Sequence, residues 1–261
     1  MVIVCSSPFW YNDEMLKDKF HICEAFGIPI TADASSAILL LLIVLDLGLP
    51  LGVPCAILLA VSIVLHELAH SLTTKAFGGR IAEIRLSLLG GCASGDIPRQ
   101  AWQELLMAAA GPAMSFLLGF GTLFAVSGVP IESAWLEAVV TYVVVMNVML
   151  GAFNLLPGFP MDGGRIFRCV MRAFMNRAKA TYWAMLVGRV SAVALVLLPF
   201  LGINHIWIIP IGGSFFRRVL IAWMIWQEGY REYLYALEEE RFSSWSQADF
   251  NARVSPPPYD R

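Results

Sequence analysis

The stretch "VSIVLHELAHSLTTKAF", residues 61–77, carries His66, Glu67 and His70 within an otherwise apolar segment. Side chains at positions i and i+4 share one face of an α-helix, so His66 and His70 can offer ring nitrogens to a single metal ion. Glu67 lies about 100° round the same helix, close to such an ion but away from the two ligand directions. A carboxylate there can accept a proton from a metal-bound water, so the pattern predicts a hydrolytic zinc site.

A catalytic zinc site usually has three protein ligands and one open position, so two histidines are too few. His21 lies in a polar N-terminal segment and His205 is expected on the far side of a membrane, which favours a carboxylate as the third ligand. Asp162 is the candidate. The prolines and glycines of "NLLPGFPMDGGRIFR" interrupt a helix and turn the chain back, so Asp162 can reach the same level within the expected membrane as His70. The alternative for Asp162 is that it only caps the helix that follows.

The composition indicates a membrane protein. The chain is 58% hydrophobic and 15% charged, whereas soluble domains average about 45–50% apolar and 25% charged residues. An ionisable side chain buried in hydrocarbon costs at least about 2–3 kcal/mol on insertion scales, so a buried His-Glu-His group calls for a compensating role. A satisfied polar cluster between helices is the alternative to metal binding.

We predict an all-α polytopic membrane protein with about six transmembrane helices and a small membrane-associated β-hairpin between helices 2 and 3. Apolar stretches near the required length of about 20 residues lie at about 35–48, 54–77, 105–127, 134–156, 183–201 and within 206–226. The first stretch is short, and Arg217 and Arg218 interrupt the sixth. Either a helix begins near Arg217 after an irregular outer segment, or the two arginines face a polar cavity.

The hairpin is predicted from residues 81–91, "IAEIRLSLLGG", with its turn at Gly90-Gly91. The distribution of positive charge predicts the topology. Nine of the 18 basic residues follow the second and fourth apolar stretches, and the turns after the first and third stretches have none. We therefore expect an integral multi-pass protein with both termini in the cytosol. The sequence lacks a Lys/Arg-rich tract, so nucleic acid is not expected as a partner.

"HELAH" in a membrane helix, followed by "NLLPGFPMDGGRI" at the end of a later one, resembles the site-2 protease family of intramembrane zinc metalloproteases. The resemblance covers most of residues 27–235. Its further matches are "GIPI" at the entry to the first core helix, "LLGGCASG" in the hairpin, "AAAGPAMS" in a Gly-Pro helix and "WQEGYREY" in the closing helix. We expect Gly111-Pro112, within "AAAGPAMS", to allow close helix packing and to kink the helix.

The resemblance implies that His66, His70 and Asp162 bind one Zn²⁺ per chain and that Glu67 is the general base. It also implies that Asn154 lies beside the catalytic centre and orients substrate or stabilises the oxyanion. An interhelical hydrogen bond is the alternative for Asn154. Two hairpin glycines have two interpretations as well: Gly90 and Gly91 either let a substrate strand lie along the hairpin edge or form a plain turn.

The implied function is that of a zinc-dependent intramembrane endopeptidase that cuts in or near transmembrane segments of membrane-anchored substrates. Expected partners are those substrates and the lipid bilayer, and a prokaryotic cell membrane is the expected location. Residues 1–27 would form a cytosolic lead-in, 28–235 the metalloprotease core and 236–261 a flexible cytosolic tail. The short loop of 27 residues between Gly78 and Glu104 indicates the compact type without PDZ or CBS domains.

Two other function classes remain open. A multi-pass metal transporter can use His and Asp within helices, but it needs a path that opens to each side in turn. A non-catalytic scaffold that binds membrane helices is the other class. The sequence does not indicate a regulator.

Overall fold

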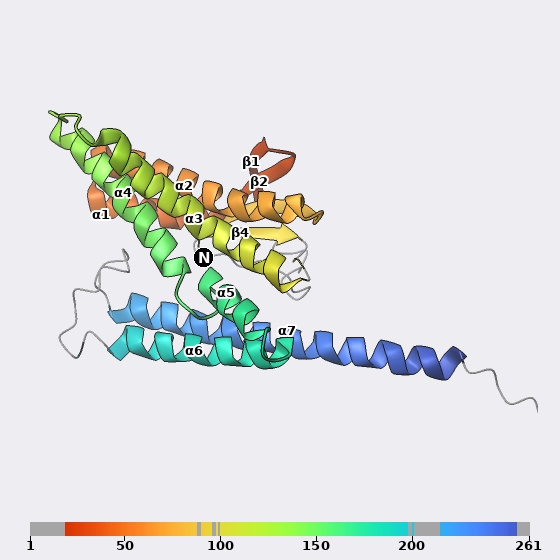
Figure 1. Ribbon diagram of the computed structural model, residues 1–261. Helices are drawn as coiled ribbons and strands as arrows, with labels where there is room; N and C mark the ends of the chain where they lie inside the picture. Colours follow the sequence, from red (N-terminus) through yellow and green to blue (C-terminus); the bar gives the residue numbers. More distant parts are fainter. Residues whose placement is uncertain are drawn as a thin grey trace, which may run out of the picture.

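The computed structural model describes residues 19–87, 90–95, 98, 100–197, 200 and 215–254. These residues form seven helices and one small sheet (Figure 1). The helices are α1 (Ala34–Leu47), α2 (Leu49–Ala76), α3 (Ala101–Val126), α4 (Ala134–Asn154), α5 (Asp162–Met171), α6 (Arg177–Leu197) and α7 (Phe215–Val254). The protein is therefore mostly helical, as the sequence predicts, with more sheet than a single hairpin.

Four helices, α2, α3, α4 and α6, are long and apolar enough to cross a membrane. The 14 residues of α1 extend about 21 Å, short of a hydrocarbon core of about 30 Å. The expected six spans are not confirmed: the described residues contain four candidates, and residues 206–214 of the sixth stretch lie outside them. A helix does begin near Arg217, since α7 starts at Phe215.

The sheet has four strands in the order β1-β2-β3-β4. Their bounds are β1 (Lys19–Ala25), β2 (Ile28–Asp33), β3 (Ile81–Ser87) and β4 (Gly90–Gly95). Strands β1 and β2 pair antiparallel, as do β3 and β4, whereas β2 and β3 pair in parallel with Ile30 opposite Ile84. The lead-in predicted for residues 1–27 therefore contains a strand from Lys19 onward, which pairs with the neighbouring strand β2. Strand β2 in turn pairs with β3, which comes from a distant part of the chain.

The predicted turn at Gly90-Gly91 is wrong. Ser87 pairs with Gly90 and Leu86 with Gly91, so both glycines belong to β4 and the connection falls before them. A glycine in a strand also occurs where the backbone approaches another group closely. Gly91 is such a position, because a β-carbon there would stand 2.3 Å from Glu67 Cγ.

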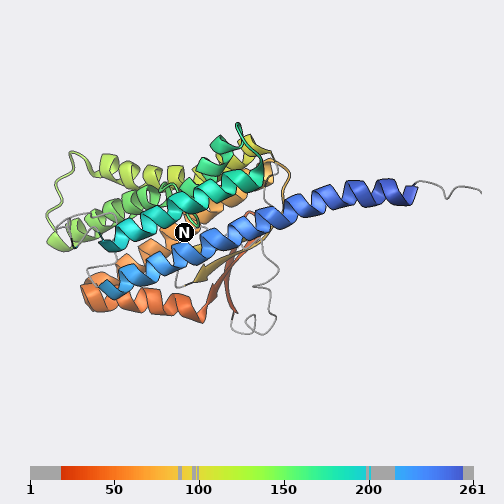
Figure 2. The same cartoon turned by 90° about the horizontal axis from the view of Figure 1, so that it is seen from below.

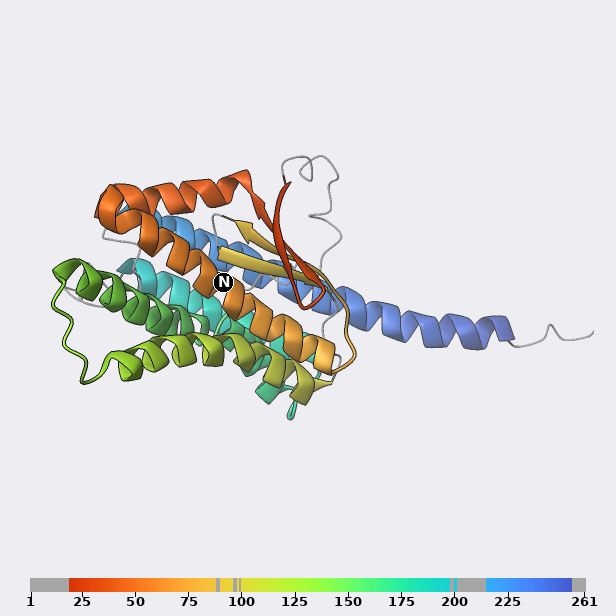
Figure 3. The ribbon, with the colours of Figure 1, turned by 90° about the horizontal axis from the view of Figure 1, so that it is seen from above.

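The sheet packs on α2 (Figure 3). Ile28 and Ile30 of β2 meet Leu68 of α2, and Ile84 of β3 and Ala93 of β4 complete the same buried cluster. Because these apolar side chains fill one face of the sheet, β4 is held against the half of α2 that carries the His-Glu-His group.

Helices α6 and α7 lie side by side, and the short helix α5 precedes α6 in the chain (Figures 1 and 2). Helix α7 continues through Val254, so the predicted flexible tail from residue 236 is helical over most of its length. Good helix formers such as the Leu, Ala, Glu and Arg of "LYALEEER" explain this continuation.

Candidate metal centre

The structure brings His66 and His70 of α2 together with Asp162, the first residue of α5. The Nε2 atoms of the histidines are 3.2 Å apart, and each is 3.3 Å from Asp162 Oδ2. All three residues are at most 1% exposed. A zinc ion bound tetrahedrally at about 2.0–2.1 Å from each ligand has ligand-to-ligand distances of about 3.3–3.4 Å. The three donor atoms therefore already have the spacing of one face of a zinc tetrahedron.

Asp162 does not act as a helix cap. The N-cap residue of α5 is Met161, which makes no side-chain capping bond, and neither carboxylate oxygen of Asp162 accepts a hydrogen bond from a described residue. Burial alone disfavours the ionised carboxylate, but the imidazoles of His70 and His66 outweigh it and hold the pKa of Asp162 below its ordinary value. A buried carboxylate whose polar neighbours among the described residues are two imidazoles fits a metal ligand better than a cap.

Helix α3 orients the two imidazoles through contacts with their Nδ1 atoms. His70 Nδ1 donates a hydrogen bond to the Met107 carbonyl oxygen at 2.6 Å, and His66 Nδ1 lies 2.8 Å from Ser115 Oγ. A hydrogen bond at one ring nitrogen fixes the ring and the tautomer, so the other nitrogen is presented to a metal. Ser115 is fully buried, so this contact is shielded from solvent.

Gly111 lies between these two contacts, since residues 107, 111 and 115 share one face of α3. A β-carbon on Gly111 would stand 2.1 Å from His70 Nε2 and 2.6 Å from His66 Nε2. The sequence interpretation of Gly111-Pro112 as packing and a kink therefore missed a direct contact with the candidate ligands. The spacing of four residues from Gly111 to the small residue Ser115 is the signal that could have revealed it.

Glu67 is fully buried, and both of its carboxylate oxygens lack a hydrogen-bond partner among the described residues. Strand β4 passes directly over it: a β-carbon on Gly91 would stand 2.3 Å from Glu67 Cγ. The missing side chain of Gly91 therefore makes room for Glu67, and Gly90 precedes it in the same strand. An unpaired buried carboxylate one residue from a candidate ligand suits a group that exchanges a proton.

Asn154 is the last residue of α4 and is fully buried. Its Nδ2 donates to the Leu150 carbonyl of its own helix at 2.9 Å, and its Oδ1 has no partner among the described residues. The interhelical bond considered for Asn154 is instead made seven residues earlier, where Asn147 Nδ2 donates to Ser62 Oγ of α2 at 3.0 Å. The catalytic role of Asn154 stays a prediction.

A protein-family model and a solved structure both match this chain. The model of peptidase family M50 matches residues 54–135 and 127–198, together more than half of the chain. The solved structure of the site-2 protease from Methanocaldococcus jannaschii matches with a TM-score of 0.59 and 30% identity, over 82% of this chain and 95% of that chain.

Curated relatives carry zinc metalloprotease names. One from Methanocaldococcus jannaschii is 38% identical over 57% of this chain and 43% of its own length. One from Synechocystis sp. is 29% identical over 82% of this chain and 59% of its own length. The chain thus spans about half the length of the curated relatives it matches. With the matched family model and the buried His-His-Asp group, the four apolar helices indicate an integral membrane protein, and the chain belongs to peptidase family M50, the site-2 protease family.

Proposed function

We propose that this protein is a zinc-dependent endopeptidase that hydrolyses peptide bonds in or near transmembrane segments of membrane-anchored proteins. One observation carries the proposal. Three buried donor atoms 3.2–3.3 Å apart lie beside an unpaired buried carboxylate, and two of the three belong to a helix long and apolar enough to cross a membrane. Hydrolytic groups at that depth meet peptide bonds that lie within or next to the bilayer.

His66, His70 and Asp162 would hold one Zn²⁺ per chain, and the buried donor set of two imidazoles and one carboxylate suits that ion. A zinc ion in such a site polarises a carbonyl and lowers the pKa of a bound water towards about 7. Glu67 accepts the proton of the attacking water and passes it to the leaving amine nitrogen. Asn154, whose Oδ1 is free to accept a hydrogen bond among the described residues, orients the substrate backbone.

Substrate is proposed to bind as an extended strand along β4. This strand stands at the end of the sheet order, so among the described residues one of its edges has no neighbouring strand. A peptide added to such an edge gains main-chain hydrogen bonds. Since Gly91 of β4 lies against Glu67, a peptide bond beside Gly90 and Gly91 would come close to the general base.

The proposed location is a prokaryotic cell membrane, with both termini and the metal centre towards the cytosol. The basic residues that follow the second and fourth apolar stretches support this orientation, and so do the organisms of the relatives, Methanocaldococcus jannaschii and Synechocystis sp.. Water would then reach the metal centre from the cytosol along a shorter path than from the opposite side of the membrane.

The test is the variant Glu67→Gln, compared with His66→Ala. Glu67→Gln should keep zinc and lose cleavage by about 10²–10⁴-fold, because it removes a general base and leaves the ligands in place. His66→Ala should lose zinc as well. Membrane proteomics of cells with wild type and with Glu67→Gln should show membrane-anchored fragments that accumulate only in the variant.

Equal cleavage of single-span substrates by purified Glu67→Gln and wild type would refute the proposal. Zinc flux across vesicles that disappears in His66→Ala, without any cleavage by wild type, would support a transporter instead.

A further inference from the structure

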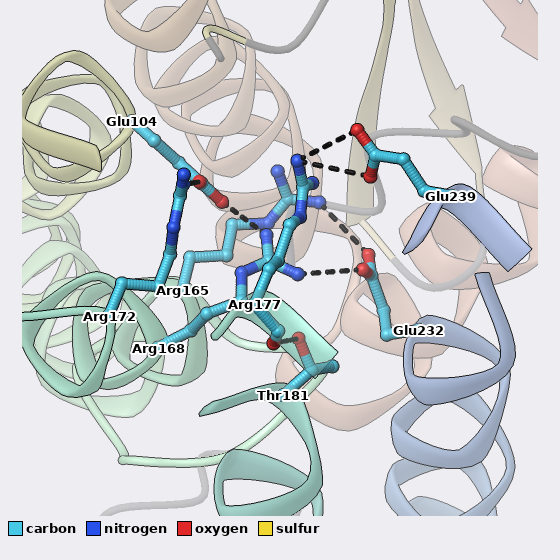
Figure 4. A network of polar contacts seen from close by, with 8 residues as sticks. All are labelled: Glu104, Arg165, Arg168, Arg172, Arg177, Thr181, Glu232 and Glu239. Atoms are coloured by element: carbon cyan, nitrogen blue, oxygen red, sulfur yellow. Dashed lines mark hydrogen bonds and ion pairs between the residues drawn. The ribbon is translucent and has the colours of Figure 1, made fainter. Parts of the chain in front are cut away.

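An ion-pair network lies near the candidate metal centre (Figure 4). Its centre joins α3, α5 and α7, and the nearby Arg177 links α6 to α7. Arg168 of α5 pairs through Nη2 with Glu104 of α3 and through Nη1 with Glu232 of α7, the latter at 3.1 Å. Arg168 and Glu104 are both fully buried. The guanidinium also stacks over the ring of Phe159, 4.9 Å from its centroid, so Arg168 is held on several sides.

Each residue of the Glu104–Arg168 pair belongs to a helix that takes part in the metal site. Glu104 lies one helical turn before Met107, whose carbonyl accepts the hydrogen bond of His70. Arg168 lies six residues after Asp162 within the ten residues of α5, a single helix only about 15 Å long. The pair therefore connects the helix that orients His70 to the helix that carries Asp162.

The Glu104–Arg168 ion pair is better suited to fixing the relative positions of helices than to adding stability. A buried ion pair often adds little net stability over well-packed apolar residues, because both charges lose their hydration. A planar guanidinium hydrogen-bonded to two carboxylates does fix directions and distances between the elements that carry them. Here those elements are α3, α5 and α7.

We propose that Arg168 is a positioning residue of the metal centre: by bridging Glu104 and Glu232 it holds Asp162 at ligand distance from His66 and His70. The inference rests on the proposed zinc site. It does not depend on the reaction carried out there.

The test is the zinc affinity of purified Arg168→Lys protein, measured by competition with a chelator. Lysine keeps the positive charge, but its single ammonium cannot reproduce the fork that reaches two carboxylates. The affinity should fall by about 10–100-fold, as for other residues that support metal ligands. Co²⁺ bound in place of zinc should show an altered visible absorption spectrum, because that spectrum reports the arrangement of the ligands.

Arg177→Lys is the matched control. Arg177 belongs to the same network but pairs with Glu239, between α6 and α7, at 3.2 Å. This variant should keep the wild-type affinity and cobalt spectrum. Glu104→Gln, which removes the same bridge from its other end, should repeat the effect of Arg168→Lys and serves in its place if that variant does not fold.

Wild-type affinity and an unchanged cobalt spectrum in Arg168→Lys would overturn the inference. An equal loss of affinity in Arg168→Lys and Arg177→Lys would also overturn it, since the effect would then be general weakening of the fold. Failure of the wild-type protein itself to bind zinc would refute the proposed function, and this outcome is distinguishable because the measurement involves no peptide substrate.

Discussion

Gly111 of α3 and His70 of α2 are in such close contact that a β-carbon on Gly111 would stand 2.1 Å from His70 Nε2. The same β-carbon would be 2.6 Å from His66 Nε2. The bare backbone of α3 therefore forms one wall of the metal site, with hydrogen bonds to both imidazoles one turn to either side.

Replacing Gly111 by alanine should strongly reduce zinc binding. The added methyl group occupies the space of both Nε2 atoms, so the imidazoles must move off their ligand positions, and we expect at least about a tenfold loss of affinity. Gly121→Ala is the control on the same helix, because nothing lies within 4 Å of its β-carbon position. Zinc per chain, measured by atomic absorption, checks the prediction; equal zinc in the two variants would contradict it.

Asp162→Ala should lower the zinc content, whereas Glu67→Gln should not. The alanine removes the carboxylate whose Oδ2 lies 3.3 Å from both histidine nitrogens, and two imidazoles alone bind zinc weakly. The zinc stoichiometry of the two purified variants distinguishes a ligand from a base. Full zinc occupancy in Asp162→Ala would remove Asp162 from the ligand set.

Gly91→Ala should reduce cleavage and leave zinc bound. The three atoms nearest to the new methyl group would be Cγ, Cδ and Oε1 of Glu67, at 2.3–2.9 Å, so the base is the first group that it displaces. A displacement of about 1 Å can cost about 10²-fold in rate. Cleavage rate and zinc content, measured on the same preparation, are the readout, and simultaneous loss of zinc would argue against this separation of roles.

Glu83 should make stability depend on pH at the acid end. Burial raises the pKa of this β3 carboxylate, but ion pairs with Lys19 and Arg85, each at 2.6 Å, outweigh it and leave the pKa below its ordinary value. The resulting stability is present above the ordinary pKa of about 4.3 and is lost as the pH falls through the lowered value.

Because these side chains are partly exposed, the contribution should not exceed about 1 kcal/mol. Thermal unfolding of Glu83→Gln should therefore occur about 2–4 °C below wild type at pH 7, and the difference should shrink as the pH is lowered below the ordinary pKa of about 4.3. A difference that does not change with pH would show that charge is not its source.

The sequence by itself determined the chemistry and the local geometry of the site. The spacing of His66 and His70 places them on one helix face through the helical repeat alone, and the Pro/Gly-rich break before Asp162 marks the end of a helix. The apolar stretches locate α2, α3, α4 and α6 with errors of up to six residues at their ends, because length and hydrophobicity are properties of the segment itself.

Only the tertiary structure decided which segments meet. The parallel pairing of β2 with β3 joins residues more than fifty positions apart, and no local pattern specifies such a partner. The same holds for Gly91 against Glu67, Gly111 against the two histidines and Arg168 between Glu104 and Glu232. These contacts arise from how helices and strands pack around a shared interior, where a missing methyl group or a buried charge acquires meaning only from its neighbours.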